Sequence, residues 1–410
     1  MAGEIALLCE VGREFMPPSD ISQVAYALVE ARPTEAVAQV RMPLNFALVL
    51  DHSGSMSGKK LASVKEAVKM VIDNLSPNDY ISLVMFSGRA DVIIPAMPAR
   101  DPQGMKAAVE RIKVGGGTNM GRGMQAGLEQ LRSQVIPNAV NRMILLTDGR
   151  TIGGKKCREL AREAREAGIV INPLGIGSDW DEDLLDDIGE LSGGAKAEFI
   201  RTPADAMSIF QQQLQSAIDV AVRNAVLTLR LPMGVSPKRA TRVLPTISEF
   251  DASVLSDRQI VLPLGDLEKN NPQAVLVELL IAPRPAGLFR VAQAELFYDV
   301  PLLRLAGEKV REDIKITFRS DAMLAGQLNP AVMNFVEKAN AHRLVSQVLD
   351  EYKRTGKATT RLAPNVTRVL DAETQAALEQ IERGRQISQE QVKAISNKTR
   401  KLTQRLDTYE

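Results

Sequence analysis

Between residues 44 and 218, short apolar runs alternate with amphipathic stretches, and this alternation constrains the fold more than any other feature of the chain. The first apolar run is LNFALVL, and the stretch GKKLASVKEAVKMVIDNL that follows has its apolar residues at helical spacing. Continuous apolar runs of this kind are typical of parallel strands that are covered on both faces. The pattern predicts an α/β fold with a doubly wound, mostly parallel sheet, in which YISLVMFS and ADVIIPAM form a hairpin at one edge.

The segments on either side of this region have the period-2 texture of antiparallel strands. EIALLCEV, SQVAYALVEA and EAVAQVRM precede it, and NAVLTLRL, RQIVLPL, AVLVELLIA, FRVAQAELFY and EDIKITF follow it. The strands before it are too few for a stable sheet of their own, whereas those after it could form one. We therefore expect residues 1–43 and 219–321 to form one antiparallel β-sandwich, with the α/β domain of residues 44–218 inserted between two of its strands.

Beyond residue 322 the strand texture stops, and residues 322–410 are expected to form a C-terminal helical region. An amphipathic helix over residues 330–352 is started by Asn329-Pro330, and weaker helices follow it. From residue 353 onward there are twelve Lys or Arg against seven Asp or Glu. Such a tilt is typical of a solvated face, and the alternative is a surface that meets an acidic partner.

The whole-chain composition excludes several classes of protein. The 51 basic and 50 acidic residues nearly cancel, so no global field attracts nucleic acid or an anionic membrane surface. Cys9 and Cys157 have no neighbouring ligands at zinc spacing, and we expect both to be buried, reduced thiols. No basic start with a long apolar run marks a signal peptide, and no stretch approaches the roughly 20 apolar residues of a membrane span. These features predict a cytoplasmic protein.

Small oxygen-bearing side chains occur at the ends of predicted strands and in one glycine-rich loop. Asp51, Ser53 and Ser55 follow the first strand in DHSGSMSG, Thr118 lies in GGGTNMG, and Asp148 follows the strand NRMILLT. In a doubly wound sheet, ligands bind beyond the carboxyl ends of the strands where the winding reverses. Two carboxylates and three hydroxyls are a ligand set for hard cations such as Mg²⁺ or Mn²⁺, with water or an outside ligand completing the shell.

Two other interpretations of DHSGSMSG compete with a metal site. Ser55 or Ser57 could simply cap the following helix. A serine nucleophile would need a base, and the chain has only His52 and His342, while GSMSG has Met56 where a nucleophile elbow has serine. GGGTNMG also lacks the lysine of a phosphate-binding loop. We therefore expect a protein that is not an enzyme.

The segment SDWDEDLLDDIGE raises two further alternatives. Its acidic residues fall partly at calcium-loop spacing, but Leu184 stands where such a loop needs glycine, which favours an acidic first turn of a helix. Trp180, the one tryptophan of the sequence, could contact a partner at the rim of the metal loops or pack against this helix.

The strand-end residues carry a resemblance to a known family. DxSxS on the first loop, a threonine on the second and an aspartate on the third are matched by Asp51, Ser53, Ser55, Thr118 and Asp148 without departure. The sequence resembles a von Willebrand factor A domain with a metal-ion-dependent adhesion site, over roughly residues 44–218, and the flanks more weakly resemble bacterial and archaeal proteins that embed this domain in a β-rich frame. The resemblance implies that the serines and the threonine contact the metal directly and that the aspartates often act through water.

The resemblance also implies a function. A carboxylate of a partner protein would take the open coordination position, so we expect a cation-dependent protein-interaction module that uses Mg²⁺, or Mn²⁺ or Ca²⁺, and binds a partner presenting Asp or Glu. The alternative is an adaptor or regulatory subunit of an AAA-type ATPase, as in chelatase or cofactor-insertion systems, with the basic helical region as the docking element.

Overall fold

The structure is a computed structural model that describes residues 3–256 and 258–404. It divides into two compact units, which we describe separately. One unit comprises residues 41–220, and the other combines the described residues before 41 with those after 220. Among the described residues, no helix has both the length and the apolar content that a bilayer crossing requires.

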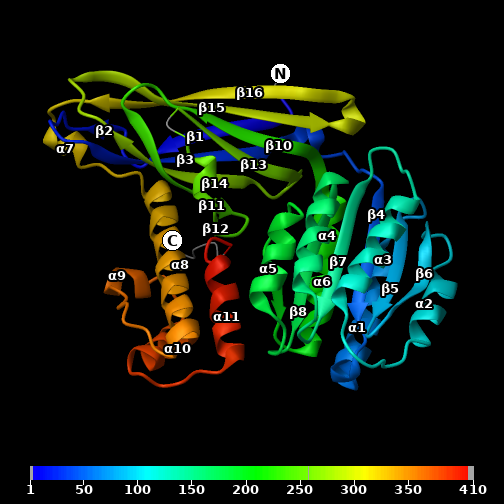
Figure 1. The fold of residues 1–410 in the computed structure, drawn as a ribbon. Helices are drawn as coiled ribbons and strands as arrows, with labels where there is room; N and C mark the ends of the chain where they lie inside the picture. The colour runs from blue at the N-terminus through cyan, green and yellow to red at the C-terminus, as the bar shows by residue number, and fades with distance from the viewer. Residues whose placement is uncertain (1–2, 257, 405–410) are drawn as a thin grey trace. The chain divides into compact units, whose positions relative to one another are not determined.

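The unit of residues 41–220 is built on a sheet of six strands in the order β6-β5-β4-β7-β8-β9 (Figure 1). All neighbouring strands are parallel except the β5–β6 hairpin, which forms one edge as the sequence predicts. The strands are β4 (Leu44–Asp51), β5 (Tyr80–Phe86), β6 (Ala90–Pro98), β7 (Val140–Thr147), β8 (Ile169–Ile176) and β9 (Glu198–Ile200). Because β4 pairs with β5 on one side and with β7 on the other, the winding reverses at β4 and leaves a crevice beyond Asp51.

Helices cover both faces of this sheet. Helices α1, α2 and α6 pack together in one layer, and α3, α4 and α5 pack together in the other. Their bounds are α1 (Lys59–Asn74), α2 (Pro102–Glu110), α3 (Met120–Ser133), α4 (Gly154–Glu166), α5 (Glu182–Leu191) and α6 (Ala206–Asp219). Every residue of β4 is buried, which is the physical reason that its sequence is apolar up to the terminal aspartate.

The other unit contains two further sheets. One has the order β1-β3-β14-β11-β12 and is antiparallel throughout; in the other, ordered β13-β10-β15-β16-β2, strands β10, β15 and β16 are antiparallel and β2 is parallel to β16. The bounds are β1 (Ile5–Val11), β2 (Phe15–Met16), β3 (Gln23–Pro33), β10 (Val220–Arg230), β11 (Val235–Leu244), β12 (Ser248–Glu249), β13 (Gln259–Glu268), β14 (Gln273–Ile281), β15 (Gly287–Val300) and β16 (Leu305–Phe318). The α/β unit is inserted between β3 and β10.

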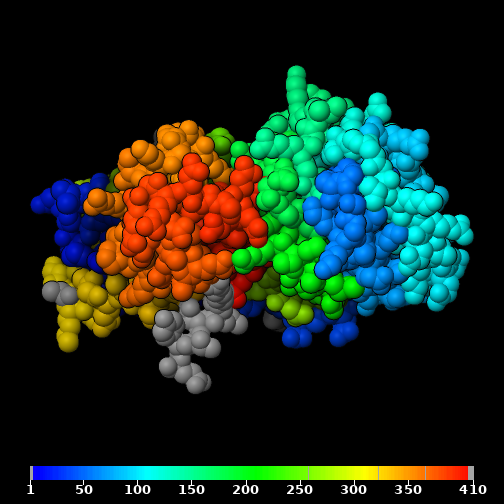
Figure 2. Space-filling model, turned by 90° about the horizontal axis from the view of Figure 1, so that it is seen from below, coloured from blue at the N-terminus to red at the C-terminus, as the bar shows by residue number. Residues whose placement is uncertain are grey.

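The C-terminal helices belong to this second unit. They are α7 (Ala322–Ala325), α8 (Pro330–Thr355), α9 (Pro364–Thr367), α10 (Ala372–Glu382) and α11 (Gln389–Arg400), coloured orange and red in Figure 2 apart from the yellow α7. The first half of α8 packs Val332 and Val336 against Leu28 and Leu276 of the sheet, and its second half shares an apolar core with α9, α10 and α11. The predicted fold class, a parallel sheet with helices, antiparallel sheets and a helical C-terminal region, is confirmed.

Two local predictions were wrong. The segment EAVAQVRM was predicted as a strand, but it forms a short 3-10 turn at Glu35–Val37, and its apolar spacing reflects the burial of Val37, Val40 and Met42. Strand β11 was not predicted, because Pro237 and several basic residues interrupt the alternation of apolar and polar residues that marks a strand. Pro237 is accommodated at a shift in the pairing register with β14, where a strand tolerates proline.

Candidate metal centre

Asp51 is the last residue of β4, at the point where the winding of the sheet reverses. Its Oδ1 accepts a hydrogen bond of 2.8 Å from the backbone N–H of Ser53, and its Oδ2 accepts one of 2.7 Å from the Thr147 hydroxyl. Burial raises the pKa of Asp51, the two hydrogen-bond donors oppose this rise, and the nearby charge of Asp148 adds to it. A buried carboxylate with another carboxylate beside it is an arrangement that a bound cation would stabilise.

The two serines bridge from Asp51 to the third loop. The hydroxyls of Ser53 and Ser55 lie 3.0 Å apart, and the Ser55 hydroxyl donates to Oδ1 of Asp148 over 2.7 Å. Ser55 is exposed, whereas Asp51, Ser53 and Asp148 are buried. The group therefore opens to solvent on the side of Ser55.

Asp148 follows β7 and has a second partner that the sequence analysis missed. Its Oδ2 lies 2.6 Å from the ammonium nitrogen of Lys60, and its side chain is fully buried while that of Lys60 is 31% exposed. Lys60 lies in the first turn of α1, and nothing in its spacing from Asp51 pointed to Asp148. The position next to Asp148 thus already accommodates one positive charge, the ammonium group of Lys60.

Thr118 lies in the loop between α2 and α3, and its contacts are made by its backbone. Its carbonyl accepts a hydrogen bond of 3.3 Å from Thr151, in the loop after Asp148. Its half-buried hydroxyl makes no hydrogen bond within the part of the chain that the structure describes. The structure therefore brings Asp51, Ser53, Ser55 and Asp148 into one hydrogen-bonded chain, places the Thr118 backbone beside the third loop, and joins the Thr118 hydroxyl to none of them.

Glycine at position 115 holds the second loop close to the first. The N–H of Gly115 donates to the His52 carbonyl over 2.6 Å. A Cβ at position 115 would lie 2.7 Å from the Ser87 hydroxyl and 3.0 Å from Cε1 of His52. This close approach explains the glycine at position 115, and the φ of +77° at Gly117 explains the glycine there.

The competing interpretations of the first loop find little support in its geometry. Helix α1 begins after Gly58 without a side-chain cap, so neither Ser55 nor Ser57 serves as its N-cap. Nδ1 of His52 lies 2.8 Å from the Lys113 carbonyl, an acceptor, so this nitrogen must be the donor. That hydrogen bond holds the imidazole ring toward the loop before α3.

The acidic segment near α5 also has a structural explanation. Asp181 caps the helix by accepting from the N–H of Leu184, as an acidic first turn predicts. Trp180 is 3% exposed, and its indole N–H donates to the Gly177 carbonyl over 2.7 Å. Of the two roles considered for Trp180, the structure shows the packed one.

The donor set limits which cation would fit. Among the described residues, no group of three or more His, Cys, Asp or Glu side chains is placed to hold a metal. The candidate centre offers two carboxylates and up to three hydroxyls, which are oxygen donors of modest total charge. Such a set suits a hard divalent cation that keeps water or an outside ligand in its shell.

Comparison with known proteins places the α/β unit in a family. Residues 45–216 match the family model described as the von Willebrand factor type A domain. An uncharacterised protein of Synechocystis, sll0103, is 30% identical over 269 residues, which are 64% of this chain and 63% of that protein. The uncharacterised protein YfbK of Escherichia coli is 24% identical over 254 residues, 58% of this chain and 44% of YfbK. The matched region is thus less than two thirds of either relative.

Two solved structures resemble nearly the whole chain. A von Willebrand factor type A protein from Catenulispora acidiphila is 18% identical with a TM-score of 0.77, covering 97% of both chains. VWA2, the ArnB paralog from Sulfolobus acidocaldarius, is 16% identical with a TM-score of 0.57, covering 98% of this chain and 99% of its own. At these identities the likeness shows the fold alone, and it includes both units and the C-terminal helices.

Proposed function

We propose that this chain, which contains a von Willebrand factor type A domain over residues 45–216, captures a partner protein through a divalent cation. Asp51, Ser53, Ser55, Thr118 and Asp148 would hold the ion, which is Mg²⁺ in our proposal, with Mn²⁺ and Ca²⁺ as alternatives. The cation would supply an electrophilic position for a carboxylate oxygen of the partner. The role is one of binding, and we propose no catalytic step.

One observation carries this proposal. Two buried carboxylates, Asp51 at the end of β4 and Asp148 after β7, are connected by a chain of hydrogen bonds: the backbone N–H of Ser53 donates to Asp51, the Ser53 hydroxyl contacts that of Ser55, and the Ser55 hydroxyl donates to Asp148. Burying two like charges in one site is unfavourable unless positive charge accompanies them. Lys60 provides one positive charge at Asp148, and a bound cation would provide further compensation.

The exposure pattern supports capture of a macromolecule. Ser55 is exposed, and exposed glycines at positions 54 and 116 flank the group. A partner's Asp or Glu could therefore approach from solvent without unfolding either loop. Because an exposed acidic side chain is a common surface feature, the selectivity for a partner must come from the surroundings of the ion.

Metal binding by the full chain is the first test. We expect Mg²⁺ to raise the melting temperature of the wild-type chain, with a stabilisation of about 2.7 kcal/mol when the ion is at 100 times its dissociation constant. Ser55→Ala should weaken this effect, whereas Ser57→Ala, which changes an exposed serine of the same loop, should leave it unchanged. Equal effects of Mg²⁺ on all three proteins would contradict the proposed ligand set.

Partner capture is the second test. The full chain, immobilised, should retain protein from lysate in Mg²⁺ and release it in chelator. Asp51→Asn, which keeps the size of the side chain, should retain much less. Retention that survives both the chelator and Asp51→Asn would refute a cation-dependent interaction.

An adaptor role in an AAA-type ATPase complex remains the second candidate. The observation that favours it is the local excess of basic residues in the C-terminal part of the sequence, twelve Lys or Arg against seven Asp or Glu from residue 353 onward. Capture of an ATPase that is lost on charge reversal in α11 but kept in Asp51→Asn would support docking by this region. The opposite pattern would assign capture to the metal centre.

A further inference from the structure

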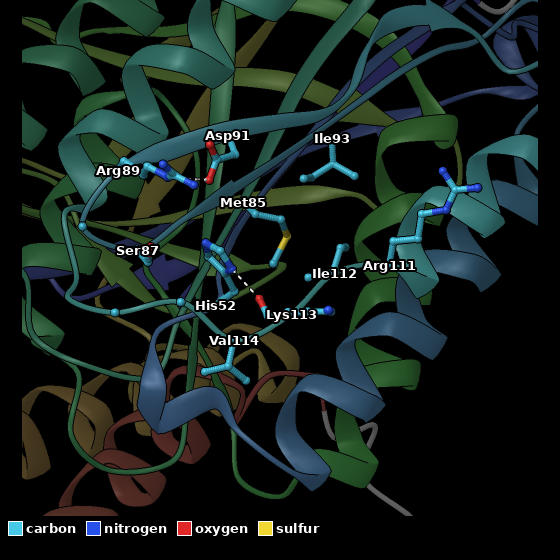
Figure 3. Close-up of a pocket in the computed structure, with 13 residues that line it drawn as sticks. His52, Met85, Ser87, Arg89, Asp91, Ile93, Arg111, Ile112, Lys113 and Val114 are labelled. Carbon is cyan, nitrogen blue, oxygen red and sulfur yellow. Dashed lines mark hydrogen bonds and ion pairs between the residues drawn. The ribbon is translucent and has the colours of Figure 1, made fainter.

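A cavity lies directly beside the candidate metal centre, and nothing in the proposed function accounts for it. Its volume is about 580 Å³, and one of its walls is formed by His52, Gly115 and Gly116 from the first and second loops. Figure 3 shows its other side chains, which come from β5, β6, the β5–β6 turn and the segment that follows α2. We call this cavity the basic pocket.

The charges around the pocket are mainly positive. Arg89, Arg111 and Lys113 line it, and Asp91 is the one acidic side chain among its lining residues. The lining residues therefore carry a net charge of +2. Asp91 lies 3.3 Å from Arg89, an exposed pair that leaves Arg111 and Lys113 without an acidic partner among the lining residues. Since the chain as a whole has a net charge of +1, this excess is local.

Part of the pocket lining is apolar, beside the polar side chains of His52 and Ser87. Met85, Ile93, Ile112 and Val114 line it, and the side chain of Val114 is exposed. A pocket of several hundred cubic ångströms with an apolar floor and a few charged groups at the rim is typical of a site for a specific ligand. It matches a peptide that carries both an apolar and an acidic residue.

The pocket and the candidate metal centre share a wall. His52 stands between Asp51 and Ser53 in the sequence, and its carbonyl accepts from Gly115, which lies three residues before Thr118. The Nδ1 atom of His52 donates to the Lys113 carbonyl (Figure 3), while its buried Nε2 has no hydrogen-bond partner within the described chain. A segment bound at the ion would therefore pass along the wall formed by His52, Gly115 and Gly116.

We propose that the basic pocket binds the residues next to the metal-binding carboxylate in an acidic segment of the partner protein. One apolar side chain of the segment occupies the floor, and a second carboxylate lies near Arg111 and Lys113. This inference rests on the proposed function, because the metal-bound carboxylate positions the rest of the segment. Nucleic acid is disfavoured as the occupant, since the lining residues include no Phe, Tyr or Trp for a base to stack on, and the one ring among them, that of His52, is held by its hydrogen bond to the Lys113 carbonyl.

Peptide selection tests the chemistry of the occupant. A library of random dodecapeptides displayed on phage would be selected on the full-length chain in Mg²⁺, with Asp51→Asn as the counter-selection. We expect the enriched peptides to contain at least two acidic residues with an apolar residue between or beside them. Failure to enrich any peptide over Asp51→Asn, or enrichment without an acidic excess, would overturn the inference.

Charge reversal tests the location. The enriched peptide, labelled with fluorescein, should bind Arg111→Glu/Lys113→Glu about tenfold or more weakly than wild type, and added salt should weaken wild-type binding. The control is Lys155→Glu/Arg162→Glu, two exposed residues of α4, for which we expect less than about a twofold change. The milder Arg111→Gln/Lys113→Gln should fall between wild type and the reversal, which guards against a folding defect.

The outcomes separate this inference from the function on which it rests. Binding that needs Mg²⁺ and Asp51 but is unchanged by both pocket variants would overturn the basic pocket and leave the metal-dependent capture intact. Binding of the peptide that persists in chelator would overturn the proposed function. Displacement of the peptide from the pocket by a single-stranded oligonucleotide would assign the pocket to nucleic acid instead.

Discussion

Replacing Lys60 with methionine should make the chain less stable without metal and should make it bind metal more tightly. Methionine keeps the unbranched stem of lysine but removes the ammonium group, so the buried carboxylate of Asp148 loses the partner that lies 2.6 Å away. In the metal-free chain this leaves one buried carboxylate without its counter-charge, while a bound cation would restore positive charge at the same place.

The magnitude follows from the burial of the pair. Exposed ion pairs contribute about 0–1 kcal/mol, and removal of one partner from a fully buried pair costs about 3–5 kcal/mol. Because Lys60 is 31% exposed and Asp148 is fully buried, we expect an intermediate loss, about 2 kcal/mol of unfolding free energy without metal. If the cation displaces Lys60 fully, the same amount returns as binding energy, which is roughly a 30-fold lower dissociation constant.

Two measurements complete the thermodynamic cycle. Urea unfolding in chelator gives the loss of stability, and isothermal titration with Mg²⁺ gives the change in affinity. Lys59→Met is the matched control, because Lys59 is an exposed neighbour, and we expect a change below about 0.5 kcal/mol. A Lys60→Met chain that binds Mg²⁺ no more tightly than wild type would refute competition between Lys60 and the cation.

Further predictions concern other parts of the chain. Cys157 is buried as predicted, whereas Cys9 is only half-buried. Desolvation raises the pKa of Cys9 to about 12 and that of Cys157 to about 11, so at pH 8 both thiols should react with a disulfide reagent far more slowly in the folded chain than in denaturant; fast labelling of the native protein would contradict these raised pKa values. Gly115→Ala should cost about 1–3 kcal/mol and weaken Mg²⁺ binding, because the added methyl would lie 2.7 Å from the Ser87 hydroxyl, and urea unfolding with calorimetric titration would detect both effects. Hydrogen bonds from two threonines lower the pKa of Glu351 to about 2 from 4.5, so its stabilising contribution should be present above pH 4.5 and disappear as the pH falls through 2. The difference in melting temperature between wild type and Glu351→Gln should therefore shrink over that interval, and a constant difference would exclude this cause.

The sequence predicted the fold correctly where the spacing of the apolar residues matched the burial of the strand. Strand β4 lies in the middle of its sheet, so its apolar residues had to be continuous, and the hairpin β5–β6 was marked by Gly88 between two strand-like runs. The sequence did not predict strand β11, because pairing with β14, rather than its own composition, makes this segment a strand. The segment after β3 was predicted as a strand but is not one, since its buried apolar residues belong to an irregular connection.

What the sequence determined by itself was the chemistry at the carboxyl ends of the strands. Parallel strands end at a common edge, so a DxSxS loop and an Asp after a second strand had to come near each other. Only the tertiary structure decided that Lys60 reaches Asp148, that Thr147 donates to Asp51, and that a basic pocket adjoins the loops. The physical reason is that these contacts join side chains from elements whose relative rotation is set by packing, which no local spacing in the sequence records.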